Sequence, residues 1–197
     1  MRNHFLLGLF LAIFFSVAVA QKVPAQGAEQ PVPPVFSAAD LAQKVPAPKA
    51  DDVKSVDGLL RAVYDVISGP AGDRDWNRFR SLFLPQARFT QTDKAPDNSG
   101  SVVYSWGVDE FVRDAQGVFS KEGFYENAIV NQVDTYGSVA QVFSSYESRH
   151  RPAEKPFTRG INSIQLLNDG KRWWVVSILW DSERADNPLP AKFATAR

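Results

Sequence analysis

The sequence predicts an α+β fold in which three helices pack on a strongly curved antiparallel sheet. Long β-rich runs fill residues 123–181, and turn-forming residues break them at three places: 136–137, 151–156 and 168–170. Two helical patterns, a short strand pair and a third helical pattern come before this stretch. The element order is therefore ααββαββββ.

The first two helices follow from apolar spacing and from their end signals. Over residues 51–68, apolar side chains recur every three or four positions, and the Gly-Pro-Ala-Gly segment 69–72 ends the pattern. A second, shorter helix begins near Asp73 or Asp75, whose carboxylate can cap the exposed amides, and we expect Pro85 to stop it. Both helices present one apolar face to a core.

The short strand pair and the third helix come next along the chain. Residues 86–92 and 101–106 are expected to be strands around a polar loop that contains Pro96 and Gly100. Apolar residues recur at helical spacing over residues 109–120. These elements complete the helical layer and the edge of the sheet.

Alternation along two of the long strands predicts which side chains face the helices. In the strand that ends near His150, we place on the interior face the small and aromatic set Ala140, Val142, Ser144, Tyr146 and Ser148. In the last strand we place inward Trp174, Val176, Ile178 and Trp180. The opposite face of that strand carries Trp173, Val175, Ser177 and Leu179, and it is also apolar.

A sheet that is apolar on both faces needs a cover on each. We therefore expect a homodimer that pairs through the outer sheet face. The alternative is that a segment of the C-terminal tail, residues 189–193, covers this face. The tail as a whole spans residues 185–197.

The N-terminus has the pattern of an export signal. Arg2 supplies a positive charge, residues 5–15 are apolar, and Ala18-Val19-Ala20 is a typical cleavage site, so residues 1–20 are expected to be a signal peptide of a periplasmic or secreted protein. An uncleaved anchor is the alternative. Residues 21–50 are rich in Pro and Ala and repeat the motif Gln-Lys-Val-Pro-Ala, which favours an extended, disordered linker. After cleavage we expect no contact with a membrane.

Composition excludes several classes of function. The 197 residues carry 22 basic and 22 acidic side chains, so no excess positive charge favours nucleic acid. Cysteine is absent, and the only histidines are His4 and His150, which argues against a zinc or copper site and against a Ser-His-Asp triad. His150 lies beside a turn, where a solvated histidine is expected. We predict no metal and no cofactor.

Several segments together resemble the NTF2-like superfamily, in particular its SnoaL-like members. The segments are Asp75–Phe83 with Ala87–Phe89, Gly123–Glu126, Val139–Glu147, Arg159–Ser163 and Arg172–Val176 with Trp180. This resemblance covers residues 51–184 and implies a cone-shaped domain. It also implies a ligand cavity between the helices and the concave sheet.

Polar residues within the apolar strands are the candidates for chemistry. Glu126, Glu147 and Arg159 lie on neighbouring predicted strands, so they are expected to meet as a structural ion-pair network. In the alternative, which the ketosteroid isomerase and dehydratase branches of the superfamily suggest, Glu126 or Glu147 is a general base with a raised pKa, and Tyr125 or Tyr146 donates a hydrogen bond. Further candidate ligand contacts are Arg159, Asn162, Ser163, Trp106 and Trp180. Gly160 is expected to mark a β-bulge.

Two functions therefore remain open. In the first, the protein binds a small apolar or amphipathic molecule in the cone, or a protein partner on the sheet, without catalysis. In the second, it is a small-molecule lyase, isomerase or hydrolase. The two differ in one structural feature, because a catalyst needs an isolated carboxylate in an accessible cavity, whereas a binding protein tolerates a carboxylate that is locked to Arg159.

Overall fold

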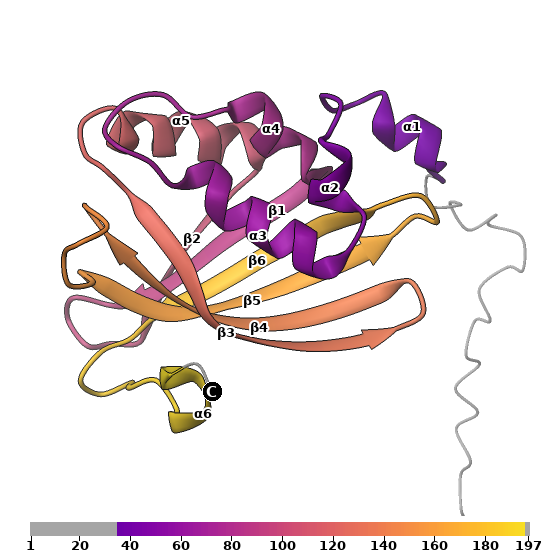
Figure 1. Cartoon of the computed structure of the whole chain (residues 1–197). Helices are drawn as coiled ribbons and strands as arrows, with labels where there is room; N and C mark the ends of the chain where they lie inside the picture. Colours follow the sequence, from indigo (N-terminus) through magenta and orange to yellow (C-terminus); the bar gives the residue numbers. More distant parts are fainter. Residues whose placement is uncertain (1–34, 196–197) are drawn as a thin grey trace, which may run out of the picture. The chain divides into compact units, whose positions relative to one another are not determined.

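Six strands form one curved sheet in the order β2-β1-β6-β5-β4-β3 (Figure 1). The structure is a computed structural model, and it describes residues 35–195. The described residues form one compact unit. The strands are β1 (Phe83–Lys94), β2 (Ser101–Trp106), β3 (Tyr125–Tyr136), β4 (Val139–Arg149), β5 (Thr158–Asn168) and β6 (Trp173–Ser182). The fold is thus the predicted α+β arrangement of helices on a curved sheet.

The sequence predicted an antiparallel sheet, but one pair of neighbouring strands is parallel. β1 runs parallel to β6, and the other neighbouring pairs are antiparallel. The register between β1 and β6 shifts between Phe83 and Arg88. Pro85, which was expected to stop a helix, lies in this shift, where the missing N–H costs no regular ladder bond.

The main helices cover one face of the sheet (Figure 1). They are α3 (Val56–Ile67), α4 (Trp76–Ser81) and α5 (Val108–Phe119), with the short α2 (Ala50–Val53) before them. The expected helix 51–68 is therefore two helices. Ser55 separates them because its side chain caps α3 by accepting a hydrogen bond from the Gly58 amide at 3.1 Å.

Between the helices and the sheet lies an aromatic core. Phe79 of α4 stacks on Phe89 of β1 and Phe111 of α5 with ring centroids 5.7 and 5.5 Å apart. On β4, the predicted interior set is confirmed, since its five residues are all buried: Ala140, Val142, Ser144, Tyr146 and Ser148.

A β-bulge in β6 changes the predicted faces of that strand. Gln165 pairs with Ser177 and Leu166 with Val175, so Val176 is an extra residue. Val175, not Val176, joins the core, and Trp173, which was predicted to face outward, packs against this core. Trp174 is fully buried, but it lies outside the core cluster and pairs with Leu167. The strict alternation that was assumed ends at the bulge.

The C-terminal tail covers part of the outer face. Helix α6 (Ala191–Ala194) lies on the side of the sheet opposite the other helices (Figure 1). The Phe193 side chain is buried and stacks on Phe143 with centroids 6.2 Å apart, and Arg159 donates a hydrogen bond to the Ala194 carbonyl at 3.0 Å. The outer-face homodimer stays a prediction.

The predicted signal peptide and the first copy of the repeated motif lie outside the described residues. Within the expected linker, the described part contains helix α1 (Ala38–Ala42), capped by Ser37, with Leu41 buried. The predicted extended linker therefore contains a helical turn near its C-terminal end. The N-cap at Ser37 and the buried Leu41 stabilise this turn. Among residues 35–195, no helix is long and apolar enough to cross a membrane.

Candidate functional site

A cavity of about 500 Å³ lies between the helical layer and the inner face of the sheet. Its walls are mainly aromatic: Phe79, Phe83, Phe89, Phe111, Phe119 and Phe124. The polar residues that reach it are Gln91, Asp114, Glu122, Glu126, Tyr146, His150 and Asn162. An apolar cavity with a few polar groups is the usual form of a small-molecule site.

Glu126 is the acidic group of most interest in this cavity. It lies near the start of β3, opposite Ser148 of β4, and Ser148 Oγ donates a hydrogen bond to Glu126 Oε2 at 2.7 Å. Burial among apolar groups raises the pKa of the Glu126 carboxyl to about 7, although hydrogen bonds from Ser148 and Asn162 oppose the shift. The residue is half-buried because its carboxyl borders the cavity. Within residues 35–195, no basic side chain forms an ion pair with it.

Tyr146 supplies a hydroxyl on the same inner face. It lies two residues before Ser148, and its Oη is 3.3 Å from Ser182 Oγ. Burial, together with the nearby Glu126, raises the pKa of the Tyr146 phenol to about 12, so the hydroxyl keeps its proton at neutral pH. A neutral phenol next to a carboxylate can donate a hydrogen bond to a bound oxygen.

Gly160 makes room for this tyrosine. It is paired in regular register with Tyr146 on one side and Ser182 on the other, so it does not mark the bulge that the sequence suggested. A Cβ at position 160 would lie 2.6 Å from Tyr146 Oη. The glycine is therefore needed for close approach of the ring, and the bulge of β5–β6 lies further along, at Val176.

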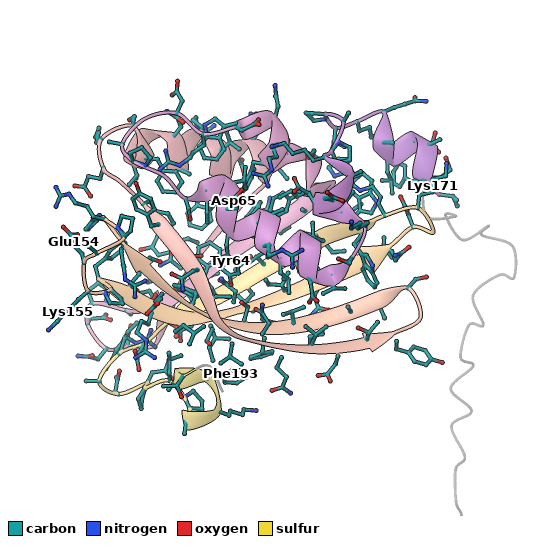
Figure 2. All side chains as sticks on the ribbon, in the orientation of Figure 1. Tyr64, Asp65, Glu154, Lys155, Lys171 and Phe193 are labelled. Carbon is teal, nitrogen blue, oxygen red and sulfur yellow. The ribbon has the colours of Figure 1, made fainter. Side chains whose placement is uncertain are left out.

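A chain of hydrogen bonds runs from the cavity to the edge of the sheet. Asn162 Nδ2 donates to Tyr64 Oη at 3.1 Å, and Ser144 Oγ donates to Asn131 Oδ1 at 2.6 Å. Because Ser144 uses its proton for Asn131, the Tyr64 hydroxyl donates to Ser144. Figure 2 shows Tyr64 between α3 and the sheet. The chain fixes the Asn162 amide, whose hydrogen bond also lowers the pKa of the Glu126 carboxyl.

Stacked aromatic rings form one wall at the mouth of the cavity. Trp106 stacks between Tyr104 and Trp180, with centroids 6.0 Å from each. Its indole Nε1–H donates to Asp114 Oδ2 at 3.0 Å, which holds the ring in place. Trp106 and Trp180 border the cavity, as expected of ligand-contacting residues.

The remaining candidates do not reach the cavity. Glu147 forms an ion pair with Arg149 at 2.7 Å on the outer face. Burial would raise the pKa of the Glu147 carboxyl, but hydrogen bonds from Arg149 and Asn127 outweigh burial and lower it. Arg159 lies opposite Glu147 in the register and pairs with Glu183 at 3.5 Å. Tyr125 and Ser163 are also absent from the cavity wall.

The expected network of Glu126, Glu147 and Arg159 is therefore wrong. Neighbouring strands bring the three residues close in register, but successive side chains of a strand point to opposite faces. Glu126 is on the inner face with Ser148, whereas Glu147 and Arg159 share the outer face. Glu147 and Arg159 each form an ion pair, but with Arg149 and Glu183 and not with each other.

His150 is exposed, as expected of a histidine beside a turn, but the sequence did not predict that it borders the cavity. It borders the cavity, its Nδ1 lies 3.2 Å from the Gly123 carbonyl oxygen, and its ring stacks on Phe157 at 4.3 Å. The alternation that placed Ser148 inside would also have placed His150 inside, two residues further. The nearby turn outweighed that signal.

Possible metal ligands are not clustered. Among residues 35–195, no group of three or more His, Cys, Asp or Glu side chains could hold a metal ion. The polar groups on the cavity wall can instead exchange protons or form hydrogen bonds with an organic molecule.

Solved structures with a similar fold are known. No protein-family model and no curated protein matches the chain. A protein of unknown function from Mycobacterium tuberculosis superposes with a TM-score of 0.53 at 14% identity, covering 72% of this chain and 78% of that one. A protein of unknown function with a cystatin-like fold from Nostoc punctiforme has a TM-score of 0.51 at 8% identity, covering 66% and 90%.

A third structure carries the name of the superfamily. It is an NTF2-like protein of unknown function from Silicibacter pomeroyi, with a TM-score of 0.46 and 12% identity over 65% of this chain and 92% of that one. Identities this low speak to fold and not to activity. Together with the helices on one face of a curved six-stranded sheet, the two likenesses with TM-scores above 0.5 show an α+β fold of the cystatin-like kind.

Proposed function

We propose that this protein binds a small apolar molecule in the cone cavity and removes a proton from it, with Glu126 as the general base. The observation that carries the proposal is the position of Glu126, an acidic side chain on the cavity wall without a basic partner among the described residues. A structural ion pair would have tied up this carboxylate. Because no such ion pair forms among the described residues, Glu126 is the isolated carboxylate in a cavity that a catalyst needs, and this favours a catalyst over a binding protein.

The protonation state of Glu126 suits this role. A general base is most effective when its pKa is close to the working pH, because it is then both ionised and basic. With a pKa of about 7, Glu126 is about half ionised at neutral pH and a stronger base than an ordinary carboxylate. Its apolar surroundings leave few water molecules to compete for the proton.

The cavity also offers a hydrogen-bond donor for the charge that forms on the substrate. Removal of a proton next to a carbonyl places negative charge on its oxygen, which needs a nearby donor. Tyr146 lies on the same face of the sheet and keeps its proton at neutral pH. We assign it the role of donor, and the substrate is then an apolar molecule with a carbonyl or hydroxyl group. An isomerisation or an elimination is the reaction class that follows.

A generic probe tests proton abstraction without knowledge of the substrate. Nitrobenzisoxazole is small, flat and apolar; a base removes its ring C–H proton, the electron pair forms a nitrile, and the N–O bond breaks to give a coloured nitrophenolate. The protein is incubated with the probe from pH 5 to pH 9. We expect a rate above buffer that rises with pH and reaches half its maximum near pH 7.

Two matched glutamate variants complete the test. Glu126→Gln should lower the rate by about 100-fold or more, the usual contribution of a general base. Glu147→Gln, on the outer face, should leave it unchanged. Equal rates for the wild-type protein and Glu126→Gln would rule out Glu126 as the base. Quenching of tryptophan fluorescence by the probe without any ring opening would instead support a binding protein without catalysis.

A further inference from the structure

The free edge of the sheet at β2 has the features of a pairing surface. β2 is the last strand on its side and pairs only with β1. Its six residues, Ser-Val-Val-Tyr-Ser-Trp, include no charge and no proline. Val103 is 63% exposed and Tyr104 is 49% exposed. An exposed edge strand of this composition is a template for another strand.

The opposite edge of the same sheet is built differently. β3 carries Asp134 and a register shift between Ala128 and Val130, and α6 packs against β3 and β4. A charge, a bulge and a covering segment are devices by which proteins block strand addition at an edge. β2 has none of them within the described residues, so the two edges differ in protection.

We infer that β2 pairs antiparallel with β2 of a second copy of this chain, which joins two sheets into one across a twofold axis. The backbone N–H and C=O groups of β2 that point away from β1 have no backbone hydrogen-bond partner among residues 35–195. Pairing with an identical strand would satisfy them. When two copies pair through β2, both β2 edges are used, so the assembly stops at a dimer.

The faces of the sheet select one register. Side chains that lie directly opposite in an antiparallel pair must be on the same face, so a residue of β2 can face itself or a residue an even number of positions away. Centring the axis on Val103 places Val103 opposite Val103 of the partner subunit and Val102 opposite Tyr104 of the partner subunit. Both are pairs of β-branched or aromatic residues, the kind that stabilises antiparallel strands.

This pairing would also complete the cavity mouth. Tyr104 stacks on Trp106, which borders the cavity, and half of Tyr104 is exposed in a single chain. In the chosen register, Val102 of the partner subunit covers that exposed ring. The second copy therefore contributes to the aromatic wall at the entrance.

The edge, and not the outer face, is the better surface for a second copy. Phe193 and the rest of α6 already occupy part of the outer face. A six-residue strand pair is small in comparison with stable dimer interfaces, so we expect an association that depends on concentration.

Cysteine cross-linking tests the register directly, because the chain contains no cysteine. In the Val103→Cys variant of the full chain, the two introduced thiols would lie opposite each other, at a Cα separation that suits a disulfide. Leu179→Cys tests the outer face, and Val139→Cys is an exposed control elsewhere in the sheet. We expect mild oxidation to link Val103→Cys at least about tenfold faster than either of the others.

Two outcomes would overturn the inference. Equal cross-linking rates for Val103→Cys and Val139→Cys would show random collisions, and faster cross-linking of Leu179→Cys would assign the dimer to the outer face. Sedimentation gives an independent reading: the wild-type protein should form dimers as its concentration rises, and Val103→Lys, which sets two like charges opposite each other, should stay monomeric. A wild-type protein that is monomeric at every concentration would also refute the pairing.

Discussion

Ser148 Oγ donates a hydrogen bond to Glu126 Oε2 at 2.7 Å across the β3–β4 pair, on the face of the sheet that lines the cavity. This bond and the one from Asn162 stabilise the carboxylate, but they do not offset burial, and the pKa of Glu126 stays near 7. The relationship between these two residues underlies the predictions that concern pH.

Replacement of Glu126 by Gln should remove a pH dependence of stability. The folded-state pKa of Glu126 is raised from 4.5 to about 7, so the folded protein binds more protons than the unfolded chain within this window. Stability from this group is therefore present at low pH and is lost as the pH rises through about 7. Urea denaturation at pH 5 and pH 8 should show a loss for the wild-type protein that exceeds the loss for Glu126→Gln by about 2 to 3 kcal/mol.

The control for this prediction is Glu147→Gln. The pKa of Glu147 is lowered, so its stabilisation is present above its ordinary pKa and is lost only in more acidic solution. Between pH 5 and pH 8 its variant should therefore follow the wild-type pH dependence. If Glu126→Gln also followed the wild-type curve, Glu126 would not be a carboxyl with a raised pKa.

Gly160→Ala should destabilise the protein. The added methyl group would lie 2.6 Å from Tyr146 Oη and would also meet the Asp181 carbonyl, so the tyrosine or the backbone must move. We expect a cost of about 2 kcal/mol or more in the free energy of unfolding. Chemical denaturation measures it.

Gly117→Ala is the matched control for this substitution. Gly117 is in helix α5, and a Cβ there meets no atom within 4 Å. Alanine should stabilise the helix by about 0.5 to 1 kcal/mol. Equal effects of the two substitutions would contradict the packing role of Gly160.

Tyr64→Phe should loosen the polar network below the cavity. The variant removes the hydroxyl that joins Asn162 to Ser144, at a cost of about 1 to 2 kcal/mol. Without this contact the Asn162 amide can rotate away from Glu126, and the pKa of Glu126 should rise further because one opposing hydrogen bond is weakened. Carbon-13 NMR of the glutamate carboxyls measures this shift. Tyr136→Phe, at an exposed ring, should change neither quantity.

Phe193→Ala should expose the outer face of the sheet. Phe193 is buried against Phe143, and Figure 2 shows it between α6 and the strands. We expect a loss of about 2 to 4 kcal/mol in stability and stronger binding of a hydrophobic dye. Val139→Ala, at a residue that is half exposed, is the control. An unchanged stability for Phe193→Ala would show that α6 does not hold to the sheet.

The strand pattern allowed much of the fold to be predicted. The interior set of β4 follows from simple alternation, because no bulge interrupts that strand against β5. The same reasoning failed in β6, where Val176 is an extra residue that no local sequence signal marks. The parallel pairing of β1 with β6 was also beyond reach, since alternation carries no information on strand direction.

The site was harder to predict than the fold. Trp106, Tyr146 and Asn162 border the cavity because alternation and element order place them there. The roles of Glu126 and Glu147 depended on the relative register of β3 and β4, which the sequence leaves open. The part played by Tyr64 depends on two hydrogen-bond partners from distant strands, Ser144 and Asn162, so its helix pattern could indicate only a core residue.

The titration of the Glu126 carboxyl, followed by carbon-13 NMR in the unliganded protein and assigned by comparison with Glu126→Gln, tests the proposed role most directly. We predict that this carboxyl is half protonated near pH 7, while the Glu147 carboxyl titrates below its ordinary range. A midpoint near 4.5 would show that water solvates Glu126 as it does a surface carboxyl, and this would contradict its role as a base in an apolar cavity.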